Sequence, residues 1–265
     1  MIGMRHLSGR LVRAAALGLG IASGGLIEPA RAVVKLDDFC RDAAGRTMVF
    51  VDITTRFAEG DDLMFKAGVE SIVKRAPPGS RLRFLTITDS FSRMDMPFDL
   101  CVPACAPDDG SCSPLQAKRV VPEFNDELER SLAGVVPKKS LSASDIALTL
   151  AYALRTRSAD ERLAIYLFSD MLERSRALDL QSLARRAAQK PERAAALRRE
   201  GLAQLRRVGF DVDLKGLRIV VFGFGREDGD RAPLDPETVE FVRQFWTEAF
   251  RALNADGVDF HGRLP

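Results

Sequence analysis

Histidine and tryptophan are nearly absent from this sequence. Its 265 residues include two histidines and one tryptophan, and His261 is the only histidine beyond the first 32 residues. A Ser-His-Asp triad would have to be built around His261, and nothing in the sequence places a nucleophile beside it. The scarcity of histidine also disfavours a zinc site of the mixed Cys/His type.

The sequence also lacks an apolar run long enough to cross a membrane. The run from Ala14 to Ile27 holds 14 residues, whereas a spanning helix needs ~20. Arginines precede this run, and a small-x-small pattern at residues 29–32 follows it. This order is typical of a signal peptide. We predict a signal peptide over residues 1–32, with cleavage near Ala32, and a periplasmic or secreted mature chain. The alternative is an uncleaved N-terminal membrane anchor.

The sequence also has no large net charge of either sign. The formal net charge is +2, and residues 1–32 contribute four of the 39 basic and one of the 37 acidic residues, so about −1 remains after cleavage. A nucleic-acid-binding surface is therefore not supported. Residues 174–207 form a local exception, with ten basic and three acidic residues. We predict an inserted pair of exposed helices whose arginine stems cover apolar surface. The alternative is a basic arm that contacts an anionic membrane surface.

Cysteine is scarce, but its number is even. The four cysteines are Cys40, Cys101, Cys105 and Cys112. In an exported chain this count favours two structural disulfides. The last three cysteines fall in a predicted loop, residues 89–119, and three pairings are open. A zinc site is disfavoured because the cysteine spacings do not match paired CxxC knuckles.

Apolar residues make up 46% of the sequence and are arranged in runs that suit buried strands. The expected strands are residues 47–52, 81–88, 163–170 and 217–225, with a short one at 258–260. Apolar residues at helical spacing follow Asp62, lie around Phe124 to Leu132, and follow Ser142 or Ser144 and Asp235. This alternation predicts one α/β domain, residues 33–265, with a doubly wound, mostly parallel sheet and helices on both faces.

Three segments place oxygen-bearing side chains where such a sheet collects its ligands, beyond the carboxyl ends of the strands. Asp52, Thr54 and Thr55 follow the first strand, Ser144 (or Ser142) begins a helix, and Ser169 and Asp170 end the 163–170 strand. Carboxylate and hydroxyl oxygens from three loops suit a hard divalent cation, with water completing the coordination.

This pattern resembles the von Willebrand factor type A family, over about residues 46–260. That family has a metal-ion-dependent adhesion site, in which an Asp-x-Ser-x-Ser motif is completed by a Thr from a second loop and an Asp after a later strand. By resemblance, Asp52 and Thr54 match the first two motif positions, Ser144 (or Ser142) the second-loop hydroxyl, and Asp170 the last acid. The resemblance implies a six-stranded, mostly parallel sheet, bound Mg²⁺ or Mn²⁺, and a role in protein binding rather than catalysis.

Two departures make this a degenerate adhesion site. Arg56 stands at the third motif position, and its guanidinium cannot ligate a cation. Either it points to solvent and a weakened site survives, or it pairs with Asp52 and replaces the metal. Thr55, one position away, offers a substitute hydroxyl. The second departure is Met171, which follows Asp170 where the family usually has glycine.

Two other functions are open. A structural or assembly subunit of an envelope complex would use the same fold without a metal. A phosphatase of the haloacid-dehalogenase-like kind would use Asp52 as its nucleophile and an acid two residues later as its general acid. That position holds Thr54, which is not an acid. We therefore predict an exported module that binds a protein partner and has no enzymatic activity.

Overall fold

The computed structural model describes residues 35–57, 60–136, 140–155, 157, 161–225 and 234–262. They lie in one compact unit, Val34–Pro265. The predicted signal peptide, residues 1–32, lies outside them. None of the helices in these ranges is both long enough and apolar enough to cross a membrane.

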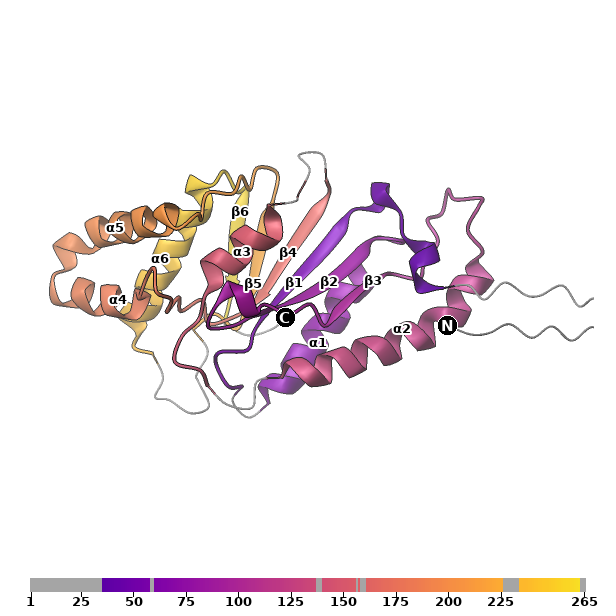
Figure 1. Ribbon diagram of the computed structural model, residues 1–265, viewed down its shortest axis with the longest axis horizontal. Coiled ribbons are helices and arrows are strands. Elements are labelled where there is room, and N and C mark those ends of the chain that lie inside the picture. The colour runs from indigo at the N-terminus through magenta and orange to yellow at the C-terminus, as the bar shows by residue number, and fades with distance from the viewer. Residues whose placement is uncertain are drawn as a thin grey trace, which may run out of the picture. The chain divides into compact units, whose positions relative to one another are not determined.

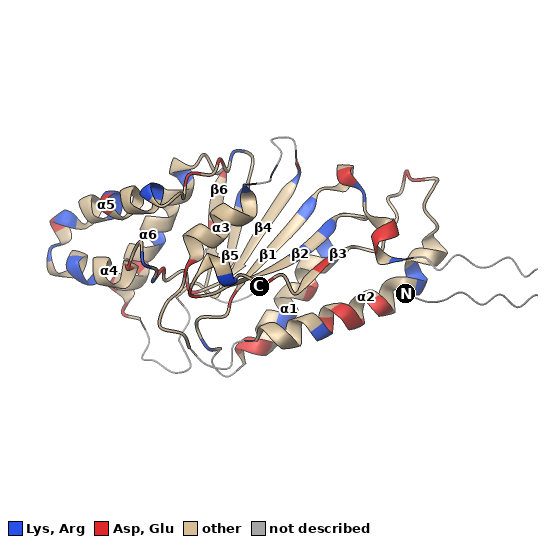
Figure 2. Ribbon diagram, in the orientation of Figure 1, with Lys and Arg blue, Asp and Glu red and all other residues tan. Residues whose placement is uncertain are grey.

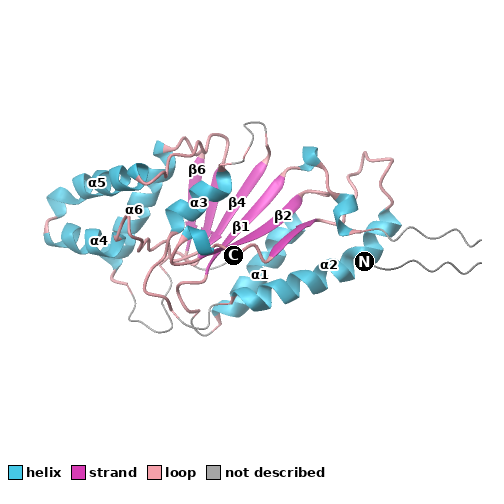
Figure 3. Cartoon of the chain, viewed as in Figure 1, coloured by secondary structure: helices cyan, strands magenta, loops and turns pink. Residues whose placement is uncertain are grey.

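A six-stranded sheet organises the unit (Figures 1 and 3). Its strands are β1 (Arg46–Asp52), β2 (Arg81–Ile87), β3 (Phe98–Cys101), β4 (Leu163–Phe168), β5 (Arg218–Phe222) and β6 (Gly257–His261). Their order across the sheet is β3-β2-β1-β4-β5-β6. All neighbours are parallel except β3, which pairs antiparallel with β2 at one edge. The strand order reverses at β1 and β4, so their carboxyl ends form the crevice in which a doubly wound sheet binds ligands.

Helices cover both faces of the sheet (Figure 1). They are α1 (Asp61–Arg75), α2 (Pro114–Val135), α3 (Ile146–Leu154), α4 (Leu180–Gln189), α5 (Ala194–Arg207) and α6 (Pro236–Ala252), with short 3₁₀ turns at Leu36–Phe39, Asp42–Ala44, Phe91–Arg93 and Pro191–Arg193. Alternate residues of β1 separate the two cores, since Val49 and Val51 pack with α1 and α2 while Met48 and Phe50 pack with α3 to α6. Central strands buried on both faces explain the continuous apolar runs.

The prediction of a loop over residues 89–119 was wrong in two places. Residues 98–101 form β3, and α2 begins at Pro114. A four-residue strand gives too short a pattern to detect, because it shows only two positions per face. The start of α2 does carry a signal, since the Ser113 hydroxyl accepts a hydrogen bond from the Gln116 amide at 3.4 Å, and proline follows as the first helical residue.

Two disulfides form, as predicted, and the structure settles their pairing. Cys40 pairs with Cys101, and Cys105 pairs with Cys112. The first bond ties the segment before β1 to the edge strand β3, so Cys101 belongs to a strand rather than to the predicted loop. The second closes a short loop before α2. These bonds account for all four cysteines, which excludes the zinc alternative for them.

The basic segment 174–207 contains the predicted helix pair, α4 and α5, but the pair is exposed on one side only. Leu180, Leu183, Leu197 and Leu205 are buried in the core shared with α6. Lys and Arg positions recur along both helices (Figure 2). The arginine at position 198 is paired with Glu248 of α6 at 2.8 Å. The insertion therefore packs on the domain instead of projecting from it.

The six-stranded, mostly parallel sheet between helices is the architecture that the resemblance implied. The described residues of this chain form that sheet, which has one antiparallel edge strand. The chain also has two disulfides. The fold is therefore a doubly wound α/β fold with a mostly parallel six-stranded sheet, as the resemblance to the von Willebrand factor type A family implied.

Candidate functional site

Asp52, the last residue of β1, is the centre of a buried polar cluster at the carboxyl ends of β1 and β4. Its side chain has no exposed surface. Its Oδ1 accepts hydrogen bonds from the amide of Thr54 at 2.9 Å and from its hydroxyl at 2.6 Å. Its Oδ2 accepts from the hydroxyl of Ser169 at 2.7 Å and from that of Ser144 at 3.5 Å. Residues from three distant segments thus meet on one carboxylate.

Asp170, which follows β4, supplies the second carboxylate of the cluster. Its Oδ2 accepts a hydrogen bond from the hydroxyl of Thr55 at 2.9 Å, and its Oδ1 accepts from the amide of Leu172 at 2.8 Å. Only 5% of the residue is exposed. Thr55 lies one position away from the expected motif serine, and its hydroxyl nevertheless reaches the last acid.

The structure distinguishes between the two serines that the sequence left open. Ser144 is buried and reaches Asp52, whereas Ser142 is exposed. The backbone of Ser144 is held by a two-way bridge to Arg174, in which each amide donates to the other residue's carbonyl at 3.0 Å. The amide of Leu141 donates to the carbonyl of Thr54 at 2.7 Å, which closes this loop over the end of β1.

Arg56 does not replace a metal by pairing with Asp52. The hydrogen bonds that Asp52 accepts come from hydroxyl groups and one amide, as given above. Arg56 is exposed, and its backbone amide donates to the hydroxyl of Ser140 at 3.1 Å. Of the two arrangements predicted for this arginine, the pairing with Asp52 is therefore not formed.

The two carboxylates are electrostatically unfavourable as they stand. Burial raises the pKa of Asp52, and the negative charge of Asp170 raises it further. Among the described residues, no lysine or arginine forms an ion pair with either acid. Uncompensated negative charge in a buried site is costly, and a bound cation would offset it.

The donor set fits a hard divalent cation. It consists of two carboxylates and the hydroxyl groups of Thr54, Thr55, Ser144 and Ser169, all oxygen ligands. A hydroxyl that donates its hydrogen to a carboxylate keeps lone pairs with which to ligate a metal. Over the part of the chain that is described, no group of three or more His, Cys, Asp or Glu side chains is placed to hold a metal, so any such site must rely on hydroxyls.

A further buried carboxylate, Glu173, escaped the sequence analysis. Its Oε2 accepts hydrogen bonds from the amides of Ile146 at 2.9 Å and Ala147 at 3.0 Å, at the start of α3. Burial raises its pKa to about 8, and the charge of Asp145 adds to the shift. The only sign of Glu173 in the sequence is an acidic residue three positions beyond Asp170. That position alone does not predict its contact with Ala147 of α3, which lies 26 residues earlier.

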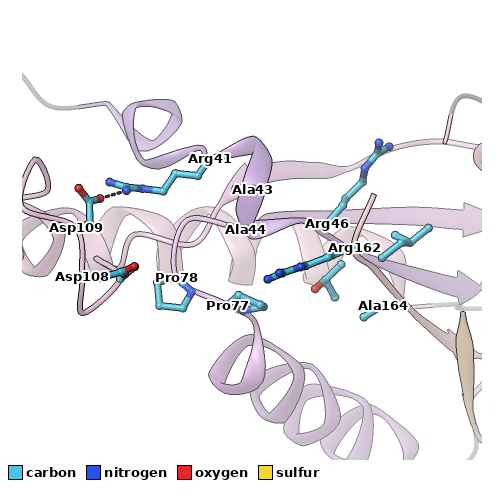
Figure 4. A pocket seen from close by; sticks show the side chains of 13 residues that line it. Arg41, Ala43, Ala44, Arg46, Pro77, Pro78, Asp108, Asp109, Arg162 and Ala164 are labelled. Carbon is cyan, nitrogen blue, oxygen red and sulfur yellow. Dashed lines mark ion pairs between the residues drawn. The ribbon is translucent and has the colours of Figure 1, made fainter. Parts of the chain in front are cut away.

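The cluster is separate from the cavity that lies at the opposite, amino-terminal rim of the sheet (Figure 4). That cavity has a volume of about 690 Å³, and its lining includes Arg41, Arg46 and Arg162. Arg41 is paired with Asp109, and the Nε of Arg46 donates to Glu161 at 2.6 Å. None of the predicted site residues lines this cavity.

The geometry does not favour the phosphatase alternative. That chemistry needs a general acid two residues after the attacking aspartate. This position holds Thr54, which carries no acid group and whose hydroxyl donates to Asp52 at 2.6 Å.

Comparison with known proteins adds little to this picture. No protein-family model matches the chain, and no curated protein matches it. Among solved structures, it is similar to proximal thread matrix protein 1 from the mussel byssus, a structure with a zinc-occupied MIDAS motif, at 10% identity and a TM-score of 0.38. The match covers 83% of this chain and 44% of that protein, so the chain spans less than half of its length. At this identity and TM-score, the likeness does not show a shared family or function.

Proposed function

We propose that this chain is an exported protein-interaction module and that its partner binds the loops at the carboxyl ends of β1 and β4. A divalent cation, Mg²⁺ or Mn²⁺, is held by Asp52, Thr54, Ser144 and Asp170. The observation that carries the proposal is the meeting of two buried carboxylates and several hydroxyls, with no ion pair between either acid and a lysine or arginine of the described residues.

The residues of the cluster have separate tasks in this proposal. Asp52 and Asp170 supply the negative charge, and the hydroxyls of Thr54 and Ser144 fix the positions of the ligating oxygens. Thr55 takes the place of the motif serine that Arg56 displaces, since its hydroxyl already lies 2.9 Å from Asp170. When bound, the cation offsets the two carboxylates and provides a positive centre for an acidic group of the partner.

A metal-free interaction subunit is the second candidate, and one observation favours it. Every hydroxyl in the cluster already has a carboxylate as its acceptor, so the cluster also serves as a set of internal hydrogen bonds that fix three loops. In that case the partner contacts the loops themselves, and divalent cations have no effect on binding.

Crosslinking in cells of the source, followed by mass spectrometry, tests the proposal when it is done with and without EDTA. The cation-dependent module loses its crosslinked partner in EDTA and regains it when Mg²⁺ is added back. Ser144→Ala abolishes the crosslink, whereas the exposed Ser142→Ala, a matched control two residues away, retains it. A crosslink that survives both EDTA and Ser144→Ala identifies the metal-free candidate.

A further inference from the structure

Glu173 joins two of the three segments that form the polar cluster. It lies in the irregular segment after β4, three residues beyond Asp170, and its side chain has no exposed surface. Its Oε2 accepts hydrogen bonds from the first two amides of α3, those of Ile146 and Ala147. The first amides of a helix have no partner within the helix, so a carboxyl group placed here satisfies two of them at once.

The same two segments are also joined through their backbones. Ser144 and Arg174 exchange two hydrogen bonds of 3.0 Å, and the amide of Leu180 donates to the carbonyl of Glu173 at 3.0 Å. The Glu173 contacts lie directly beside this bridge, because Glu173 precedes Arg174 and Ile146 follows Ser144 by two residues. The segment that carries Asp170 and the loop that carries Ser144 are therefore held together by a side-chain contact and a backbone bridge.

We propose that Glu173 is the positioning residue of the cluster and that, by anchoring the start of α3, it holds the hydroxyl of Ser144 against Asp52. This inference depends on the proposed cation site. It adds to that site a residue that does not itself contact the cation. The Ser144 hydroxyl is the contact most sensitive to loop position, since at 3.5 Å it lies at the limit of a hydrogen bond, whereas Thr54 and Ser169 lie well within it.

The hydrogen bonds of Glu173 dictate which substitutions are informative. Oε2 alone receives both amide hydrogens, and the hydroxyl of Ser175 also lies close enough to the carboxyl group to lower its pKa. The amide oxygen of Glu173→Gln can therefore take the place of Oε2. Glu173→Ala removes the acceptor, and Glu173→Asp keeps a carboxyl group but shortens its reach by one methylene, which provides a second variant if the alanine variant does not fold.

A double-mutant cycle with Mn²⁺ titration of the full chain tests the proposal. We expect Glu173→Ala or Glu173→Asp to weaken Mn²⁺ binding by about tenfold, the size of one ordinary lost interaction. Glu173→Gln should remain within about threefold of the unaltered chain, which corresponds to less than 1 kcal/mol. In a Ser144→Ala background, Glu173→Ala should have no further effect, because it acts through that hydroxyl. The helix cap Asp235, which binds the Thr238 amide of α6 at 2.7 Å, provides the control. Asp235→Ala should lower the melting temperature and leave Mn²⁺ binding unchanged.

Two results would overturn the positioning role. One is an equal loss from Glu173→Ala with and without Ser144, which indicates a general structural effect. The other is Mn²⁺ binding that does not change in Glu173→Ala. If the unaltered chain binds no Mn²⁺, the proposed function fails, and amide hydrogen exchange tests the inference separately. Exchange at Ser144, Ile146 and Ala147 should be about tenfold faster in Glu173→Ala than in Glu173→Gln, and equal rates would refute the anchoring of α3.

Discussion

The indole N–H of Trp246 donates a hydrogen bond of 2.7 Å to the carbonyl oxygen of Met171. Met171 stands directly after Asp170 and adopts a φ of 62°, a left-handed conformation that favours glycine. Its side chain is fully buried beside α6. Methionine therefore stands where the von Willebrand factor type A family usually has glycine, and its left-handed backbone is stabilised by burial of the side chain and by Trp246.

Substitutions at Met171 should reveal the backbone strain at this turn. Alanine and glycine both remove the buried side chain, which costs about 2–5 kcal/mol. Only glycine adopts the left-handed conformation without strain, since this conformation costs other residues about 1–2 kcal/mol. We expect Met171→Gly to be more stable than Met171→Ala by about 1 kcal/mol in urea unfolding, because glycine avoids this strain. The opposite order would show that Met171 carries no such strain.

The stability of the chain should fall as the pH rises through neutrality. Burial raises the pKa of Glu173 from its ordinary 4.5 to about 8, so the folded chain holds this proton more tightly than the unfolded chain. The stabilisation is complete below the unfolded pKa and is lost as the pH rises towards the folded pKa, with a limiting slope of about 1.4 kcal/mol per pH unit. Urea unfolding at about pH 5.5 and about pH 7.5 measures it.

Glu173→Gln is the matched variant for that measurement, since glutamine cannot titrate. We expect its stability to fall less steeply over the same range. A smaller decline should persist, because burial also raises the pKa of Asp52 and Asp145. If the two chains lose stability equally, Glu173 is not protonated in the folded state.

The two disulfides should differ in their contribution to stability. Cys40 and Cys101 are separated by 61 residues in sequence, and Cys105 and Cys112 by seven. Because a longer closed loop removes more entropy from the unfolded chain, the chain-entropy model gives about 4 and about 2.5 kcal/mol for the two bonds. We expect the double substitution Cys40→Ser with Cys101→Ser to lower the free energy of unfolding more than Cys105→Ser with Cys112→Ser. A larger loss from the short loop would contradict this expectation.

The sequence predicted the parts of the fold that have long, periodic patterns. Buried strands such as Arg46–Asp52 and Leu163–Phe168 are recognisable because both faces are apolar, and the acids at their ends could then be placed at one rim. The meeting of Asp52 with Ser144 and Ser169, 92 and 117 residues away, follows from that strand order.

Other features could not be predicted, because they depend on contacts without a local pattern. The edge strand Phe98–Cys101 is too short for its alternation to be visible. The pairing of Cys40 with Cys101 requires that edge strand to be in place. Glu173 reaches the first amides of α3 from an irregular segment, and no spacing rule connects the two. The deep burial of the cluster likewise results from how the loops close over it.

Titration calorimetry of the disulfide-bonded chain with Mn²⁺ and Mg²⁺ tests cation binding by the Asp52–Asp170 cluster most directly. We predict saturable binding at one site, retained in Ser142→Ala and weakened by about tenfold or more in Asp52→Asn, which keeps the size of the side chain but removes its charge. Indistinguishable titrations of the unaltered chain and Asp52→Asn would contradict the proposed cation site.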